Sequence, residues 1–138
     1  MLKNNPLVLV FCKNQILGKV KSRLALKIGQ KKALLIYSEL VNKTASIVNS
    51  LSLEVHLYYS DYIEENDNFN PSKVKKFIQK GNNLGDRIIN ALNTSFKKFS
   101  PVVIIGSDLW KLEISDIEDA FRILKNKNIV IGPSTDGG

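Results

Sequence analysis

The chain of 138 residues is 43% hydrophobic and 24% charged, which is ordinary for a soluble globular protein, and we expect residues 1–138 to form one domain. Its single cysteine, Cys12, excludes intrachain disulfides and a cysteine metal cluster. No apolar run reaches about 18 residues and no small-residue cleavage site stands near the start, so we expect a cytoplasmic protein without a membrane span. The net charge of +7 favours an anionic partner, and its scatter favours a nucleotide phosphate over nucleic acid.

The first predicted element is a buried strand within residues 8–13, an apolar run rich in β-branched side chains. Four basic residues mark the loop that follows: Lys13, Lys19, Lys21 and Arg23. If the loop is extended, its alternation places the last three cations on one side and Val20 against the core. Converging cations suit a di- or triphosphate. The loop matches neither the Walker A nor the GxGxxG pattern, and a solvated basic loop is the alternative.

The middle of the chain predicts two helices and two strands. Apolar residues recur at helical spacing from Gln30 to Leu51, which predicts a long helix. Residues 53–59 alternate as a strand, on which we expect His56 to be a hydrogen-bonded or half-exposed bystander. A polar loop at residues 61–71 and a weak strand at 74–79 follow. After a turn at residues 81–83, a helix carries an apolar stripe from Leu84 to Phe99.

The last third of the chain predicts two more buried strands and the fold class. Residues 102–105 are continuously apolar, which is typical of a central strand covered on both faces. A capping box at Ser115–Glu118 opens a helix, and residues 129–131 predict a further strand. Strands alternating with helices predict an α/β fold with a mostly parallel, Rossmann-like sheet and helices on both of its faces.

Two aspartates follow these late strands. Asp108 comes after the strand at 102–105 and Asp136 after that at 129–131. The carboxyl ends of parallel strands meet at one edge, so both carboxylates and the basic loop should lie there, where ligands bind. Phosphate-binding cations with carboxylates for a hard divalent cation indicate metal-assisted nucleotide chemistry. A turn or helix-cap role is the alternative for Asp108.

Four stretches carry a resemblance to a known family: residues 11–24, 81–87, 105–108 and 132–138. In this order they resemble the bacterial glycosyltransferase-like family also labelled radical-SAM/selenodomain-associated transferase. They are similar, more distantly, to guanylyltransferases such as the one acting on 2-phospho-lactate. The resemblance implies a nucleotide-diphospho-sugar transferase fold of the GT-A type, with the nucleotide at the carboxyl edge of the sheet.

The resemblance also implies a set of site residues. The candidates for nucleotide or phosphate binding are Lys13, Gly18, Lys21, Arg23, Asn83, Asp86 and Arg87. Among these, Lys21 and Arg23 would contact phosphates, and we hypothesise that Asn83 and Asp86 line the base or sugar pocket. The implied cofactor is Mg²⁺ or Mn²⁺, held by Asp108. The two aspartates, Asp108 and Asp136, are the candidates for catalysis and for metal binding.

The chain also departs from the family pattern. Prolines are usual at the positions of Gln15 and Leu17, and without them the loop should be more flexible before ligand binds. The usual Cys-Pro pair after Asp108 is replaced by residues 109–110, and Thr135 stands where the family has a further carboxylate. Because relatives usually continue past the last motif, we expect a C-terminally truncated sheet whose exposed edge is covered by homodimerisation or in some other way.

These features predict a transferase that binds a nucleotide or nucleotide-sugar with a divalent metal and displaces a phosphate-activated group onto an unidentified acceptor. One alternative is a guanylyltransferase-like nucleotidyltransferase that releases pyrophosphate. The other is a catalytically degenerate nucleotide-binding or interaction module, which the carboxylate missing at Thr135 favours.

Overall fold

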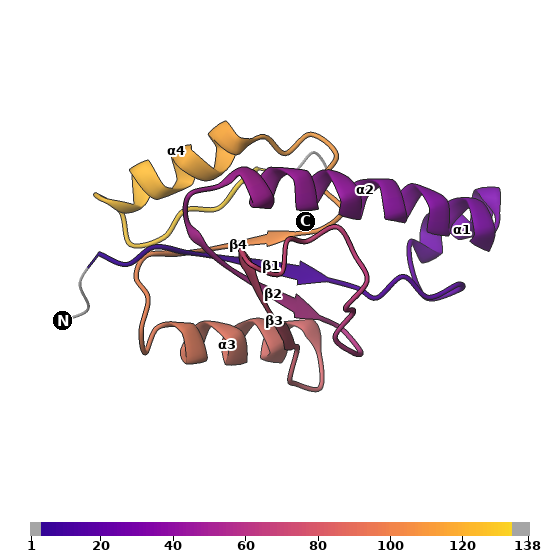
Figure 1. Ribbon diagram of the computed structural model, residues 1–138, viewed down its shortest axis with the longest axis horizontal. Helices are drawn as coiled ribbons and strands as arrows, with labels where there is room; N and C mark the ends of the chain where they lie inside the picture. Colours follow the sequence, from indigo (N-terminus) through magenta and orange to yellow (C-terminus); the bar gives the residue numbers. More distant parts are fainter. Residues whose placement is uncertain (1–3, 134–138) are drawn as a thin grey trace.

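The computed structural model describes residues 4–133 and shows a parallel sheet between two layers of helices (Figure 1). The elements in chain order are β1 (Leu7–Cys12), α1 (Ser22–Ile28), α2 (Gln30–Ser50), β2 (Glu54–Tyr59), β3 (Val74–Ile78), α3 (Leu84–Ser95), β4 (Val102–Gly106) and α4 (Ile114–Leu124). The four strands lie in the order β3-β2-β1-β4, and every neighbouring pair is parallel. The predicted Rossmann-like α/β class is therefore confirmed.

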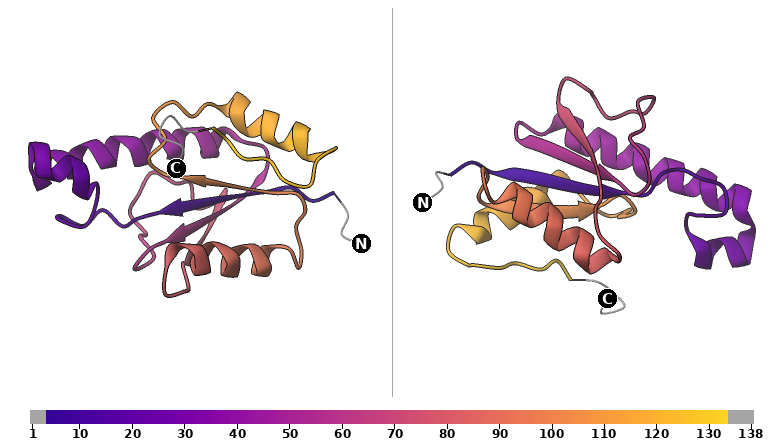
Figure 2. Two further views of the ribbon diagram at one scale, coloured as in Figure 1. Left: turned by 180° about the vertical axis from the view of Figure 1, so that it is seen from behind. Right: turned by 90° about the horizontal axis from the view of Figure 1, so that it is seen from below.

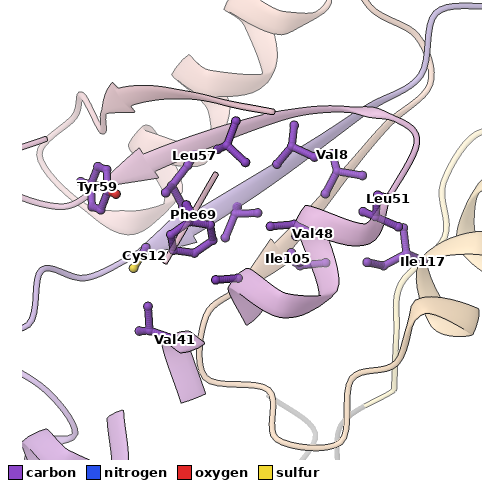
Figure 3. Close-up of a cluster of buried hydrophobic side chains, with 14 of the residues drawn as sticks. Val8, Cys12, Val41, Val48, Leu51, Leu57, Tyr59, Phe69, Ile105 and Ile117 are labelled. Carbon is purple, nitrogen blue, oxygen red and sulfur yellow. The ribbon is translucent and has the colours of Figure 1, made fainter. Parts of the chain in front are cut away.

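Helices cover both faces of the sheet, α2 and α4 on one and α3 on the other, as the views in Figure 2 also show. Alternate side chains of β1 enter two separate cores. Val8 and Val10 pack in a cluster with side chains of α2, shown in Figure 3, whereas Leu7 and Leu9 pack in a second cluster with Ala91 of α3. Burial on both faces explains why β1 is continuously apolar, since each face of a covered parallel strand needs apolar contacts.

Two strand predictions need correction. Residues 129–131 form no strand in the described chain, and Ile129 and Ile131 are 76% and 84% exposed. A strand requires a hydrogen-bonded neighbour, and this segment pairs with none within residues 4–133. The strand at 102–105 is β4, but it lies at an edge of the described sheet rather than at its centre, and most of it is only half-buried. Apolar composition does not determine the order of strands.

The start of α4 also differs from its prediction. The helix begins at Ile114, and the carboxylate of Asp116 accepts the backbone N–H of Glu113 at 2.9 Å. The capping box is therefore built by Glu113 and Asp116 instead of Ser115 and Glu118. Both pairs have the three-residue spacing that the motif requires, so the spacing alone did not separate them. Among the helices described, none has the length and apolar character needed to cross a membrane.

Candidate functional site

A cleft of about 900 Å³ opens at the carboxyl edge of the sheet, and we call it the cationic cleft. Its wall on one side comes from α1, and its opposite side comes from Asn82 and Asn83, which follow β3. The ends of β1 and β4 reach it through Lys13 and residues 106–108, and Tyr37 of α2 also lines it. The cleft therefore occupies the strand ends at which parallel α/β sheets bind ligands.

The wall from α1 carries most of the positive charge. Lys21, Arg23 and Lys27 line the cleft, Lys13 adds a fourth cation from the end of β1, and Arg87 of α3 adds a fifth. Within residues 4–133, ion pairs involve Lys21 but none of the other four cations. Exposed cations that the protein does not neutralise favour an anionic ligand with several charges, such as a diphosphate.

The local backbone at this wall differs from the extended loop that was predicted. Lys21 has a left-handed backbone, with φ 50° and ψ 49°, and helix α1 begins at the next residue. Val20 is buried as predicted, which anchors the start of the helix. Arg23 and Lys27 are four residues apart and so share a helix face. Lys27 was not among the predicted site residues, because no helix was predicted over residues 22–28. The four-residue spacing of Arg23 and Lys27 is the sequence signal that would have indicated both the helix and the residue.

Asp108 faces the cationic wall from the end of β4. Its carboxylate lies 3.8 Å from the Lys21 ammonium, and both side chains are partly exposed, at 51% and 31%. Asp108 is the acidic residue among the described lining of the cleft, and residues 4–133 contain no group of three or more potential metal ligands of the His, Cys, Asp or Glu type. The other predicted carboxylate, Asp136, lies outside the described residues.

With Asp108 as its acidic residue, the described lining of the cleft fits a divalent metal only if a bound ligand supplies further oxygen atoms. Mg²⁺ keeps several waters and is typically held by one or two carboxylates together with the phosphates of a substrate. Asp108 supplies one such carboxylate beside a wall that suits phosphates. The described residues therefore fit an ion that Asp108 and a bound diphosphate would hold jointly, rather than a cage built by protein ligands alone.

The turn after β3 is braced by Arg87. Its guanidinium donates hydrogen bonds to the carbonyl oxygens of Gly81 at 3.1 Å and Ser60 at 3.4 Å, and to Oε1 of Gln79 at 3.3 Å. Gly81 has φ +145°, and a Cβ there would lie 2.8 Å from the backbone nitrogen of Arg87, so only glycine fits. The structure thus gives Arg87, a predicted phosphate ligand, a bracing contact with the loop at the edge of the cleft.

The remaining predicted residues lie in different places. Asn83 lines the cleft and caps α3, because its Oδ1 accepts the backbone N–H of Asp86 at 2.8 Å. The carboxylate of Asp86 is absent from the lining and accepts a hydrogen bond from Nδ2 of Asn83 at 3.2 Å. Gly18 lies in an exposed turn with φ +82°, also outside the lining.

A buried cluster of Cys12, Tyr37 and Ser107 lies at the inner end of the cleft. The hydroxyl oxygens of Tyr37 and Ser107 are 2.6 Å apart, and Sγ of Cys12 is 3.7 Å from the tyrosine oxygen. Burial raises the pKa of the Cys12 thiol and the pKa of Tyr37 above their usual values. Cys12 is therefore a packed, protonated thiol.

A second hollow of about 310 Å³ lies beside the first, and we call it the amide crevice. It shares Cys12 and Lys13 with the cationic cleft, and Asn42, Asn66 and Asn68 are among its lining residues. Several of its polar groups are paired within the protein. For example, Nδ2 of Asn68 donates to Oδ1 of Asn42 at 2.7 Å.

Comparison with known proteins agrees with this geometry. A family model described as "Uncharacterized protein conserved in bacteria (DUF2064)" matches residues 43–138, more than half of the chain. The chain is also similar to a crystal structure from Desulfovibrio desulfuricans G20, described as a candidate nucleotide-diphospho-sugar transferase, with 25% sequence identity and a TM-score of 0.76. The similarity covers 90% of this chain and 56% of that one. No curated protein matches the chain.

Proposed function

The chain belongs to the DUF2064 family, and we propose that its cationic cleft binds the diphosphate of a nucleotide or nucleotide-sugar for a transfer reaction. The observation that carries this proposal is the placement of five cations around one cleft at the carboxyl edge of a parallel sheet: Lys13, Lys21, Arg23, Lys27 and Arg87. The similarity to a candidate nucleotide-diphospho-sugar transferase supports the same ligand class.

The cations would serve both binding and transfer. In the proposed reaction an acceptor oxygen forms a bond to the activated carbon while the bond from that carbon to the diphosphate breaks. The negative charge that develops on the departing diphosphate faces Lys21, Arg23 and Lys27, whose fixed positive charges stabilise it. Asp108 would hold Mg²⁺ or Mn²⁺ together with the phosphates, and the ion would add further positive charge at the same oxygens.

A panel of nucleotides and nucleotide-sugars, each with and without Mn²⁺, tests the proposal by thermal shift and isothermal titration. A ligand of the native state raises the melting temperature by mass action. In Arg23→Ala we expect the affinity for the best ligand to fall about tenfold, because a charge-assisted hydrogen bond is lost. Lys97→Ala is the matched control, since Lys97 is an exposed cation just after α3 that does not line the cleft. Equal losses in both variants would refute the site.

Nucleotide binding without transfer is the second candidate function. The observation that favours it is that the lining described within residues 4–133 holds one acidic residue, Asp108. Incubation with the nucleotide-sugar that binds best separates the candidates, because transfer or hydrolysis releases the nucleoside diphosphate and mere binding does not. Release of pyrophosphate from a nucleoside triphosphate would instead identify a nucleotidyltransferase.

A further inference from the structure

A tyrosine hydroxyl joins the ends of two neighbouring strands beneath the cationic cleft. Tyr37 comes from α2 and is 3% exposed. Its oxygen accepts the backbone N–H of Lys13 at 2.9 Å and lies 2.6 Å from Oγ of Ser107, which is 4% exposed. Lys13 directly follows β1 and Ser107 directly follows β4, and these strands are hydrogen-bonded neighbours. One side chain from the covering helix therefore links two loops that line the cleft.

Packing alone does not explain this hydroxyl. The ring of Tyr37 belongs to the main core cluster, and phenylalanine would fill the same space. A buried hydroxyl is unfavourable unless it is hydrogen-bonded, and both hydrogen-bond partners within 3 Å belong to residues that line the cleft. Because burial raises the pKa of Tyr37, the hydroxyl stays protonated at neutral pH. It can therefore accept the backbone N–H of Lys13 and also form a hydrogen bond with Oγ of Ser107.

We propose that Tyr37 is a positioning residue that sets the separation between the cations and the carboxylate of the cleft. Ser107 directly precedes Asp108, so a fixed Ser107 fixes the backbone that carries the carboxylate. Lys13 begins the loop that leads to Lys21, so a fixed Lys13 backbone restrains the cationic side. This inference rests on the proposed function, because it takes the cleft to be the diphosphate site.

The test compares Tyr37→Phe with Thr44→Val. Thr44 is a matched control, since it is a buried hydroxyl on the same helix, 2% exposed, that donates to the carbonyl of Leu40 at 3.0 Å and to no other group within residues 4–133. The first readout is amide hydrogen exchange of the free protein over residues 13–19 and 107–112. We expect faster exchange in both segments for Tyr37→Phe and no change there for Thr44→Val, because only the first substitution removes the link.

The second readout is the affinity for inorganic pyrophosphate and for the nucleoside diphosphates, measured by isothermal titration with Mg²⁺. For Tyr37→Phe we expect affinity about three- to tenfold weaker, the effect of one or two lost hydrogen bonds on placement of the binding groups. Ser107→Ala should weaken binding similarly. If Tyr37 acts through Ser107, the double variant Tyr37→Phe with Ser107→Ala should bind little more weakly than either single variant.

The outcomes separate this inference from the proposed function. Tyr37→Phe that lowers the melting temperature like Thr44→Val, but leaves exchange and affinity unchanged, would show a structural role only and overturn the inference. If the wild-type protein binds neither pyrophosphate nor any nucleotide, the proposed function fails and the affinity half of the inference falls with it. Hydrogen exchange in the free protein still decides in that case whether Tyr37 holds the two loops.

Discussion

The cationic cleft and the amide crevice lie on either side of Lys13, yet they use charge in opposite ways. In the crevice, the buried carboxylate of Asp67 lies 2.9 Å from the ammonium of Lys76 and also accepts the N–H of Phe69 at 3.2 Å. In the cleft, Arg23 is exposed and takes part in none of the ion pairs of the described chain. The charge of Asp67 in the crevice is therefore neutralised by a protein side chain, whereas the charge of Arg23 in the cleft is not.

This contrast distinguishes the crevice, which we call the structural frame, from the cleft, which is the proposed binding site. Asn14 is an example of the internal pairing at the crevice. Its Oδ1 accepts the backbone N–H groups of Asp61 at 2.9 Å and Tyr62 at 3.1 Å, and its Nδ2 donates to the Tyr62 carbonyl. Polar groups whose hydrogen bonds are satisfied internally stabilise the fold and have little left to offer a ligand. Lys13, Arg23 and Lys27 take part in none of the ion pairs described within residues 4–133, so their charges are available to an anion.

The largest expected effect is on stability, at the crevice. In Asp67→Ala the ammonium of Lys76 would be buried without its partner, because the two side chains are only 7% and 9% exposed. We expect the free energy of unfolding in urea to fall by about 3 kcal/mol or more. Asp119→Ala is the control, since it breaks an exposed ion pair with Arg122 and should cost at most about 0.5 kcal/mol. Equal losses would contradict the assignment of the crevice as frame.

The next effect is on binding, at the cleft. If Asp108 holds the ion as proposed, then in Asp108→Asn the enhancement of nucleotide affinity by Mn²⁺ should largely vanish, a loss of about tenfold in the presence of the ion. Without metal, affinity should stay the same or rise, because a negative charge near the phosphates is removed. Isothermal titration with and without Mn²⁺ measures both. An unchanged dependence on Mn²⁺ would exclude Asp108 as a ligand.

The sequence predicted the strands and long helices of this molecule better than it predicted the cleft. β1 and β4 follow from continuous apolar runs, β2 from alternation, and the long helices α2 and α3 from an apolar period of 3.6, all of which are local properties of the chain. Helix α1 was not predicted, because it has only seven residues and its first two belong to an alternation from Lys19 to Arg23 that is typical of an extended segment. The contact of Tyr37 with Ser107 joins residues 70 apart in the chain, and no local pattern records such a pairing.

A smaller effect combines stability and binding at Lys21. Its left-handed backbone is unfavourable for any residue with a Cβ, and glycine removes that cost. Lys21→Gly should therefore raise the free energy of unfolding by about 0.5–1 kcal/mol while it weakens nucleotide binding, because the ammonium is lost. Lys19→Gly is the control, since Lys19 lacks a positive φ and should lose stability slightly. Lower stability in Lys21→Gly would show that the backbone there is not strained.

The smallest effect is a dependence of stability on pH that arises at His56, on the face of the sheet that α3 covers. His56 is buried between the rings of Phe77 and Phe99, at centroid distances of 5.0 and 5.2 Å, and its Nε2 lies 3.1 Å from a carboxylate oxygen of Glu54. Burial lowers the pKa of His56 below its usual 6.5, and this outweighs the opposite effect of Glu54.

The unfolded chain therefore takes up a proton at a higher pH than the folded chain does. The contribution of neutral His56 is complete above the unfolded pKa near 6.5, and it is lost as pH falls from there to the folded pKa. A hydrogen bond from Lys75 lowers the pKa of Glu54, so Glu54 titrates below this window. Urea unfolding between pH 7.5 and 5.5 should show the wild-type protein losing stability, with a flatter profile for His56→Phe. Parallel profiles for the two proteins would mean that the dependence arises from another group.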